Sequence, residues 1–247
     1  MQIRRRSSSD SDTGELKVAE NKVWYLKHSR LFERATDETI SNCEKLFVQT
    51  DCSKGKVLFH QGDEGRLVYL VKRGTVRIAR HTADDKDVTI AILGAGSIFG
   101  EEVVFSKVER RTIAVCMTEA LLCTARAEHV YGLMTRFPQL AVNVAKYISE
   151  QRDEAMAIAE DLAYLTVPER LVRLFGRLAK EHGKPVAGGT LLDIRLTHYD
   201  LASLIGSTRE TVSLKLRELV RAGHIRLDER AIVVLTKDST TAPARAV

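Results

Sequence analysis

Apolar and polar residues alternate over short runs between about Lys45 and Arg126. Runs such as KVLFH, LVYLV, VTIAIL and RTIAV are separated by segments that contain glycine. Strands of this length, with turn residues at this spacing, are typical of antiparallel barrels and jelly rolls. The pattern therefore predicts an N-terminal β domain, which we place at residues 21–137.

The pattern changes at Pro138 to one long helix without internal glycine or proline as far as Val167. Seven positions recur at alternating steps of four and three residues: Val144, Ile148, Gln151, Ala155, Ile158, Leu162 and Leu165. Such a 3.5-residue repeat is the seam of a two-stranded coiled coil, whereas a helix packed on its own domain has a wider stripe with a period of 3.6. Residues 138–166 are therefore predicted to form the dimerisation helix of a homodimer.

The chain from residue 167 to 236 predicts a winged helix-turn-helix. Pro168 opens an apolar helix, and a glycine-containing loop, GKPVAGGT, follows it. Thr197 and Asp200 then form a cap for a short helix that runs to about Leu204. A turn, a second helix and the hairpin HIRLDERAIVVL complete the motif, with the hairpin as the wing.

The second helix of this motif has an apolar and a polar face. Its start is predicted near Thr208, with Ser207 and Glu210 as a capping box, and its end at Gly223. The apolar stripe comprises Val212, Leu216, Leu219 and Val220. The candidate DNA-binding residues are those at the start and on the other face: Ser207, Thr208, Arg209, Glu210, Ser213, Leu214, Lys215 and Arg217.

The polar face suits the major groove of double-stranded DNA. Arg209 can bind O6 and N7 of guanine, and Glu210 can accept a hydrogen bond from N4 of cytosine, although its carboxylate can serve the cap as well. Lys215 and Arg217 can reach phosphates, while Leu214 offers only apolar contact, for instance to a thymine methyl group.

Composition fits this interpretation. The chain has 247 residues, 44% of them hydrophobic, and a net charge of +5, which suits a polyanionic partner. Neither a run of eighteen apolar residues nor a secretory signal occurs, so we expect a cytoplasmic protein without a membrane partner. The polar ends predict a disordered tail at 1–20 and a flexible tail at 237–247; the RRRSSS segment is compatible with a kinase target or with a plain solvated tail.

The four cysteines form neither a CxxC pair nor a metal-finger spacing, and no metal site is predicted. Cys116 and Cys123 would lie opposite each other if MTEALL formed a tight hairpin, as a redox pair or as two small buried side chains.

The order of these parts resembles the cyclic-AMP receptor protein/FNR superfamily of bacterial transcription regulators, over roughly residues 30 to 236. GSTRETVSLKL resembles the family's recognition helix, in which Arg209 and Glu210 match two base-reading positions. Leu214 stands where a second arginine is usual. The resemblance implies an α+β fold, with a cyclic-nucleotide-binding-like jelly roll, a dimerisation helix and a winged helix-turn-helix, and it implies RNA polymerase as a partner.

The segment FGEEVVFSKVERRT resembles the family's cyclic-nucleotide site. Gly100, Glu101, Arg111 and Thr112 hold the places of a Gly-Glu pair and an Arg-Ser/Thr pair, which would bind a cyclic phosphate and a ribose hydroxyl. The alternative is that Glu101 and Arg111 only pair with each other.

Other positions depart from the cyclic-AMP pattern. Ala155 and Met156 stand where a Thr-Ser pair would reach the purine, and Ile113 narrows the site. A cyclic nucleotide, another anionic effector and no effector therefore all stay open.

Other sensing chemistries and functions find less support. The first forty-two residues contain no cysteine, so no iron-sulfur cluster is expected, and lone histidines such as His60, His81 and His129 do not indicate haem. No catalytic motif indicates an enzyme. The alternative function is a cyclic-nucleotide-binding module that acts on a protein partner, which leaves the helix-turn-helix unexplained.

Overall fold

The computed structural model describes residues 30–82, 87–106, 109–228 and 231–235. The tails predicted at 1–20 and 237–247, including RRRSSS, lie outside these ranges. Within the described ranges, every helix is too short or too polar to cross a membrane.

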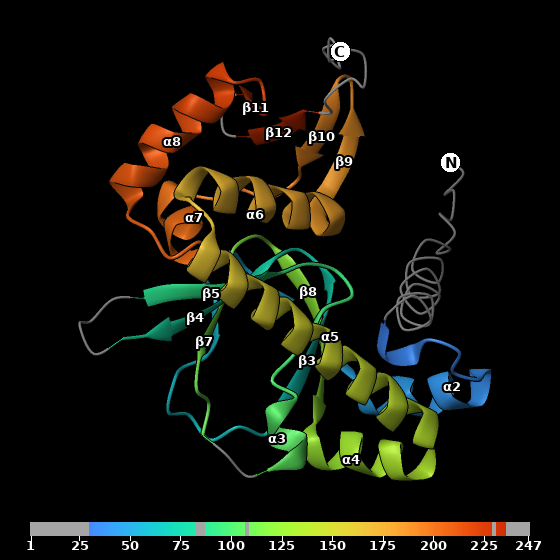
Figure 1. Cartoon of the computed structure of the whole chain (residues 1–247). Helices are drawn as coiled ribbons and strands as arrows, with labels where there is room; N and C mark the ends of the chain where they lie inside the picture. Colours follow the sequence, from blue (N-terminus) through green and yellow to red (C-terminus); the bar gives the residue numbers. More distant parts are fainter. Residues whose placement is uncertain (1–29, 83–86, 107–108, 229–230, 236–247) are drawn as a thin grey trace, which may run out of the picture. The chain divides into compact units, whose positions relative to one another are not determined.

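Strands β1 to β8 form two four-stranded sheets (Figure 1), with strand orders β1-β8-β3-β6 and β2-β7-β4-β5. Their bounds are β1 Val48–Cys52, β2 Val57–Phe59, β3 Leu67–Arg73, β4 Val76–His81, β5 Asp87–Leu93, β6 Ile98–Phe99, β7 Ile113–Cys116 and β8 Ala120–Arg126. Pairing in the first sheet is antiparallel, with Thr50 opposite Leu122 and Tyr69 opposite Phe99. The short alternating runs of the sequence therefore form the predicted β domain.

The central strand β3 is buried on both faces. Val68 and Leu70 belong to a core that the helices cover, whereas Tyr69 lies against Phe59 and Phe99 on the other side. Successive side chains of a strand point to opposite faces, so covering both faces requires a continuous apolar run such as LVYLV.

Three helices supply the covering layer of the first sheet (Figure 1). These are α2 (Asp37–Leu46), α4 (Ala127–Arg136) and the first turns of α5 (Pro138–Tyr164). A 3-10 helix η1 (Arg30–Phe32) and a four-residue helix α3 (Glu102–Phe105) complete this part of the chain.

The long helix α5 has 27 residues and starts at Pro138 as predicted. Proline suits the first helical position because its missing N–H would have no partner there. The helix ends at Tyr164, and Thr166 caps the next helix, so the helical segment is slightly shorter than the predicted 138–166.

The predicted seam needs one correction at its start. Val144 is 8% exposed and lies in the core of its own domain together with Tyr147, so it is not available to a partner chain. From Ile148 onward the seam positions are exposed or partly exposed; Ile148 is 40% exposed and Leu162 is 46% exposed. An apolar side of α5 is thus left uncovered over its later turns.

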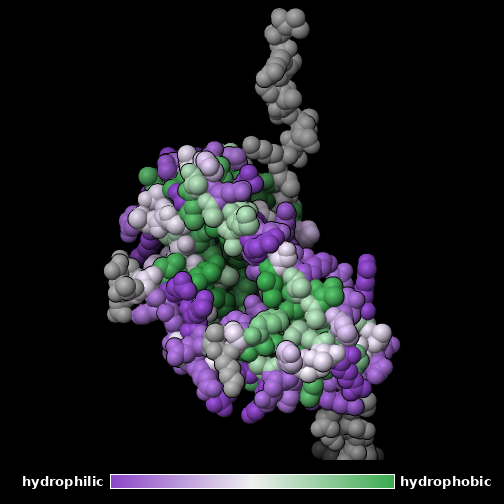
Figure 2. Space-filling view, turned by 60° about the horizontal axis from the view of Figure 1, so that its bottom comes forward, coloured by the Kyte–Doolittle hydropathy of each residue, from purple (hydrophilic) through white to green (hydrophobic). Residues whose placement is uncertain are grey.

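Exposure of apolar side chains is not confined to α5. Phe105, Tyr131 and Val142 are all more than half exposed, and Figure 2 shows apolar patches between hydrophilic areas on the face it presents. Exposure alone therefore does not identify a dimer interface, whereas a periodic series along one helix is a stronger indication.

The C-terminal part contains three helices and a four-stranded antiparallel sheet of order β11-β12-β10-β9. The bounds are α6 Val167–His182, β9 Gly183–Val186, β10 Gly189–Leu192, α7 His198–Leu204, α8 Arg209–Arg221, β11 Ile225–Asp228 and β12 Ala231–Leu235. The predicted α+β fold class is confirmed.

The segment GKPVAGGT is not the predicted loop. It lies mostly within the hairpin of β9 and β10, and Gly188 supplies a positive φ of 79° at the turn. Pro185 disfavours a central strand, but β9 is an edge strand, where a missing N–H is tolerated. Because β10 also pairs with β12, the wing hairpin β11–β12 belongs to a larger sheet.

Cys116 and Cys123 are not paired across a hairpin, because β7 and β8 belong to different sheets. Cys123 lies opposite Gln49 on one side and Leu70 on the other. Both thiols are buried, and burial raises the pKa of Cys116 to about 11. The redox pair is thus wrong, and the alternative of two small buried side chains is confirmed.

Candidate functional site

Helices α7 and α8 are joined by a tight turn at Gly206. Its φ of 60° favours glycine, and an added Cβ would lie 2.8 Å from Cδ2 of Leu162. At the start of α7, Asp200 accepts hydrogen bonds from the backbone N and the Oγ1 of Thr197 at 2.9 and 2.6 Å. The predicted Thr197–Asp200 cap, the end at Leu204 and the glycine turn are therefore confirmed.

Arg170 of α6 holds this turn from the other side. Its Nη1 donates to the carbonyl oxygens of Ile205 at 2.7 Å and of Gly206 at 3.4 Å. These carbonyls follow the end of α7, where backbone oxygens lack helical partners and a cation is favourable. Nothing in the local sequence distinguishes Arg170 from the other arginines of α6, so this contact was not predictable from the sequence.

The cap of α8 differs from the prediction by one residue. Thr208 is the N-cap, and its Oγ1 accepts a hydrogen bond from the N–H of Thr211 at 3.2 Å. Ser207 instead donates its backbone N–H to the carbonyl of Ala202. The capping box of Ser207 with Glu210 is thus wrong, and the exposed Glu210 carboxylate is not needed for it.

The two faces of α8 separate as the periodicity predicted. Val212, Leu216 and Leu219 are buried, whereas Val220 is 38% exposed and belongs to the edge of the stripe. The exposed side carries Arg209, Glu210, Leu214 and Arg217. Thr208 at the cap is also exposed, and Gly223 follows the helix with a φ of 69°.

Besides Thr208 at the cap, two of the candidate DNA-binding residues have side-chain partners within the protein. Lys215 pairs with Glu218 at 2.9 Å. Ser213 donates its hydroxyl hydrogen to the carbonyl of Arg209 at 2.8 Å, and its Oγ lies 2.7 Å from Nδ1 of His198. His198, the exposed first residue of α7, was missed, because the sequence does not show that α7 begins beside the middle of α8.

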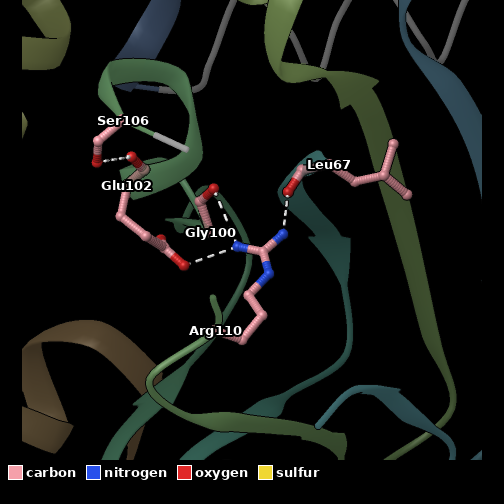
Figure 3. A network of polar contacts seen from close by, with 5 residues as sticks. All are labelled: Leu67, Gly100, Glu102, Ser106 and Arg110. Atoms are coloured by element: carbon pink, nitrogen blue, oxygen red, sulfur yellow. Dashed lines mark hydrogen bonds and ion pairs between the residues drawn. The ribbon is translucent and has the colours of Figure 1, made fainter. Parts of the chain in front are cut away.

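A second polar network surrounds the turn between β6 and α3 (Figure 3). Gly100 has a φ of 75°, and an added Cβ would lie 2.6 Å from Nη1 of Arg110, so only glycine fits. Nη1 donates to the Gly100 carbonyl at 3.2 Å and to Oε1 of Glu102 at 2.7 Å. Nη2 donates to the carbonyl of Leu67.

The guanidinium of Arg110 is almost completely buried, with 2% of its side chain exposed. It also lies over the ring of Phe59, 4.3 Å from the centroid, a contact worth about 2 kcal/mol when water is excluded. Breaking a fully buried ion pair costs about 3–5 kcal/mol, and less here because the Glu102 side chain is 37% exposed. The Glu102 carboxylate therefore neutralises the positive charge of Arg110, which is buried in the β domain.

The four predicted residues of this site differ in their burial and in their contacts. Gly100 and Glu101 form the turn, and Glu101 is largely buried, which raises the pKa of its carboxyl. Arg111 is exposed and Thr112 is partly buried. The arginine that meets Gly100 is Arg110, and its carboxylate partner is Glu102 rather than Glu101.

The histidines considered for haem, His60, His81 and His129, are all exposed. Among the described residues, no group of three or more His, Cys, Asp or Glu side chains could hold a metal ion.

Comparison with known families matches the two sites separately. Residues 49–137 match the cyclic nucleotide-binding domain, and residues 169–239 match the Crp-like helix-turn-helix domain. A cyclic AMP receptor protein of Thermus thermophilus is 31% identical over 85% of this chain and 94% of its own length. The chain belongs to the cyclic AMP receptor protein/FNR family.

A further relative and a solved structure are also similar to this chain. A global nitrogen regulator of Nostoc is 30% identical over 73% of this chain and 82% of its own length. A solved structure of a c-di-GMP responsive global regulator of Xanthomonas campestris shares the fold, with a TM-score of 0.70 and 23% identity over 82% of this chain and all of that one.

Family membership confirms the predicted function at its general level. Cyclic AMP receptor protein/FNR proteins are DNA-binding transcription regulators and not enzymes, and dimerisation is typical of them. The helix-turn-helix also argues against the alternative of a module that acts only on a protein partner.

Proposed function

We propose that this regulator is a homodimer that binds an inverted-repeat DNA site through α8, under the control of an anionic small molecule in the β domain. The observation that carries the proposal is the start of α8, where the side chains of Arg209 and Glu210 are exposed. A recognition helix reads bases with residues near its N-terminus, so these two side chains are the ones we assign to base edges.

Uncovered apolar residues on α5 support the homodimer. Ile148 and Leu162 are 40% and 46% exposed. Burying such side chains against a second copy is favourable by about 25 cal/mol per Å² of apolar surface. We therefore assign the interface to α5 from Ile148 onward, together with Gln151, Ala155, Ile158 and Leu165 of the predicted seam.

The residue types around the Gly100 turn suit an anionic ligand. Arg110 supplies a guanidinium for a phosphate, Gly100 lets the backbone approach closely, and the Glu101 carboxyl can meet a hydroxyl. Arg111 and Thr112 stay predicted ligand contacts. A bound nucleotide would supply the negative charge that Arg110 binds.

The compound itself is not assigned. The names of the relatives refer to cyclic AMP, to c-di-GMP and to nitrogen regulation. Ala155 and Met156 also lack the hydroxyl groups that the cyclic-AMP pattern would require. We further propose RNA polymerase as a partner, which rests on the family resemblance alone.

Selection from randomised DNA duplexes with the full chain tests the proposed function. We expect an inverted repeat whose half-site centres are one helical turn, about 34 Å, apart, because two symmetric copies of α8 occupy successive major grooves. A non-palindromic optimum, or no enrichment with and without added nucleotides, would reject the proposal.

His198 is expected to support DNA binding through Ser213. The single hydrogen of the Ser213 hydroxyl goes to Arg209, so Nδ1 of His198 donates to Oγ. His198→Leu should weaken DNA binding by roughly threefold to tenfold, because a hydrogen bond that fixes the outer face of α8 is lost. His198→Asn retains an N–H donor at the position of Nδ1 and should restore most of the affinity in a fluorescence anisotropy titration. Equal affinities for His198→Leu and the wild type would contradict this role.

A further inference from the structure

The Glu102 carboxylate binds Nη1 of Arg110, one of the two terminal nitrogens that a ligand anion can bind. Nη1 of Arg110 carries two hydrogens, and both have acceptors: Glu102 Oε1 at 2.7 Å and the Gly100 carbonyl at 3.2 Å (Figure 3). A phosphate oxygen that binds Nη1 must therefore displace one of these two oxygens.

The two acceptors differ in how easily they can leave. The Gly100 carbonyl is part of a backbone turn with positive φ, packed directly against the guanidinium. Glu102 is a flexible side chain, 37% exposed, at the start of a helix of only four residues. Glu102 is therefore the acceptor that can be exchanged.

The exchange never leaves the buried guanidinium without a counter-charge. An anionic ligand that replaces Glu102 puts one negative charge in the place of another, which avoids the cost of an unpaired buried cation. Glu101 is less suited to this role, because burial raises the pKa of its carboxyl and the negative charge of Glu102 raises it further.

We propose that Glu102 is a built-in competitor of the effector, whose anionic group must displace the Glu102 carboxylate from Arg110. The inference rests on the proposed effector site in the β domain. The Glu102–Arg110 contact then sets the effector concentration to which the regulator responds. Displacement also frees the start of α3 from Arg110, which gives the β domain a local difference between its liganded and unliganded states.

Glu102→Gln in the full chain tests this inference, because glutamine keeps the length and an acceptor oxygen but removes the charge. Cyclic AMP, cyclic GMP and c-di-GMP are the probes, with binding measured by calorimetry and stability by thermal unfolding. We expect roughly tenfold tighter binding of whichever probe binds, since the competing bond loses its charge assistance. Without a ligand, the variant should melt below the wild type, because Arg110 has lost its charged partner.

Glu109→Gln is the matched control, because it removes the same charge from an exposed residue beside Arg110. It should leave both affinity and melting temperature nearly unchanged. A similar gain in affinity for Glu109→Gln would show a general effect of charge and overturn the competitor role. Glu102→Ala, which removes the acceptor as well, should bind the probe at least as tightly as Glu102→Gln.

The outcomes separate this inference from the proposed effector site. If the wild type binds a probe and Glu102→Gln binds it equally or more weakly, the competitor role is wrong and the effector site stands. If a probe binds Glu102→Gln but not the wild type, the Glu102 carboxylate blocks the site completely, which would support the competitor role. If neither protein binds any probe, the proposal of a nucleotide effector fails, and the competitor fails with it.

Discussion

Replacing Ile148 and Ile158 together with lysine is expected to give a monomer that binds the inverted repeat at least roughly 100-fold more weakly. Both are seam residues, and Ile148 is 40% exposed in the single chain. Lysines would place positive charges from both copies in one apolar interface, which destabilises the dimer. A monomer binds only one half-site at a time and therefore loses the gain in affinity from linked sites, which is about 10²–10⁴-fold. Sedimentation gives the oligomeric state, and fluorescence anisotropy with a two-half-site duplex gives the affinity.

Val142→Lys is the control for this experiment. Val142 is 59% exposed on the same helix but projects from another side of it, so the dimer should persist. Leu162 is also a seam residue, but it lies beside the Gly206 turn, so its substitution would change the helix-turn-helix as well as the interface. A dimer that survives both lysines at positions 148 and 158 would show that the interface lies elsewhere.

Arg209→Ala is expected to reduce affinity by about 1–3 kcal/mol and to remove the preference for guanine at one position of each half-site. Arg209 is the first residue of α8 and its side chain is exposed, so its guanidinium can reach O6 and N7 of a guanine. Because the contact is bidentate, arginine discriminates guanine from the other bases at that position. Repeating the duplex selection with the variant measures the change base by base.

Arg217→Ala is the matched comparison, because Arg217 lies two turns further along the exposed face. A phosphate contact carries no sequence information, so this variant should bind all sequences more weakly and lower the salt dependence by about one unit of slope. Unchanged base preferences in Arg209→Ala would mean that α8 does not present Arg209 to the bases.

The periodic parts of the chain were predictable because their patterns arise from local geometry. A strand such as LVYLV buries side chains on both of its faces. A helix such as α8 buries one face, through apolar residues three or four positions apart such as Val212, Leu216 and Leu219. The β domain, the long helix and the helix-turn-helix therefore followed from the order of the residues. The β9–β10 hairpin was not predictable in this way, because Pro185 and three glycines indicate a loop until a neighbouring strand is present.

The contacts of individual side chains were decided by the tertiary structure. Two adjacent arginines, Arg110 and Arg111, both suit an anion site in the sequence, and the family motif favours Arg111. The fold buries Arg110, whose guanidinium meets the Gly100 and Leu67 carbonyls and Glu102, and it leaves Arg111 exposed. The same applies to Val144, which satisfies the 3.5-residue repeat but packs into its own domain.

The sequence by itself determined the class of fold, the approximate extent of α5, α7 and α8 and the buried stripe of α8, because hydrophobic spacing and capping residues act over a few neighbouring positions. Only the tertiary structure decided that Arg110 pairs with Glu102, that His198 meets Ser213 and that Arg170 holds the Gly206 turn. Each of these contacts joins residues from different elements or across a turn, and their distances depend on how the elements pack rather than on spacing along the chain.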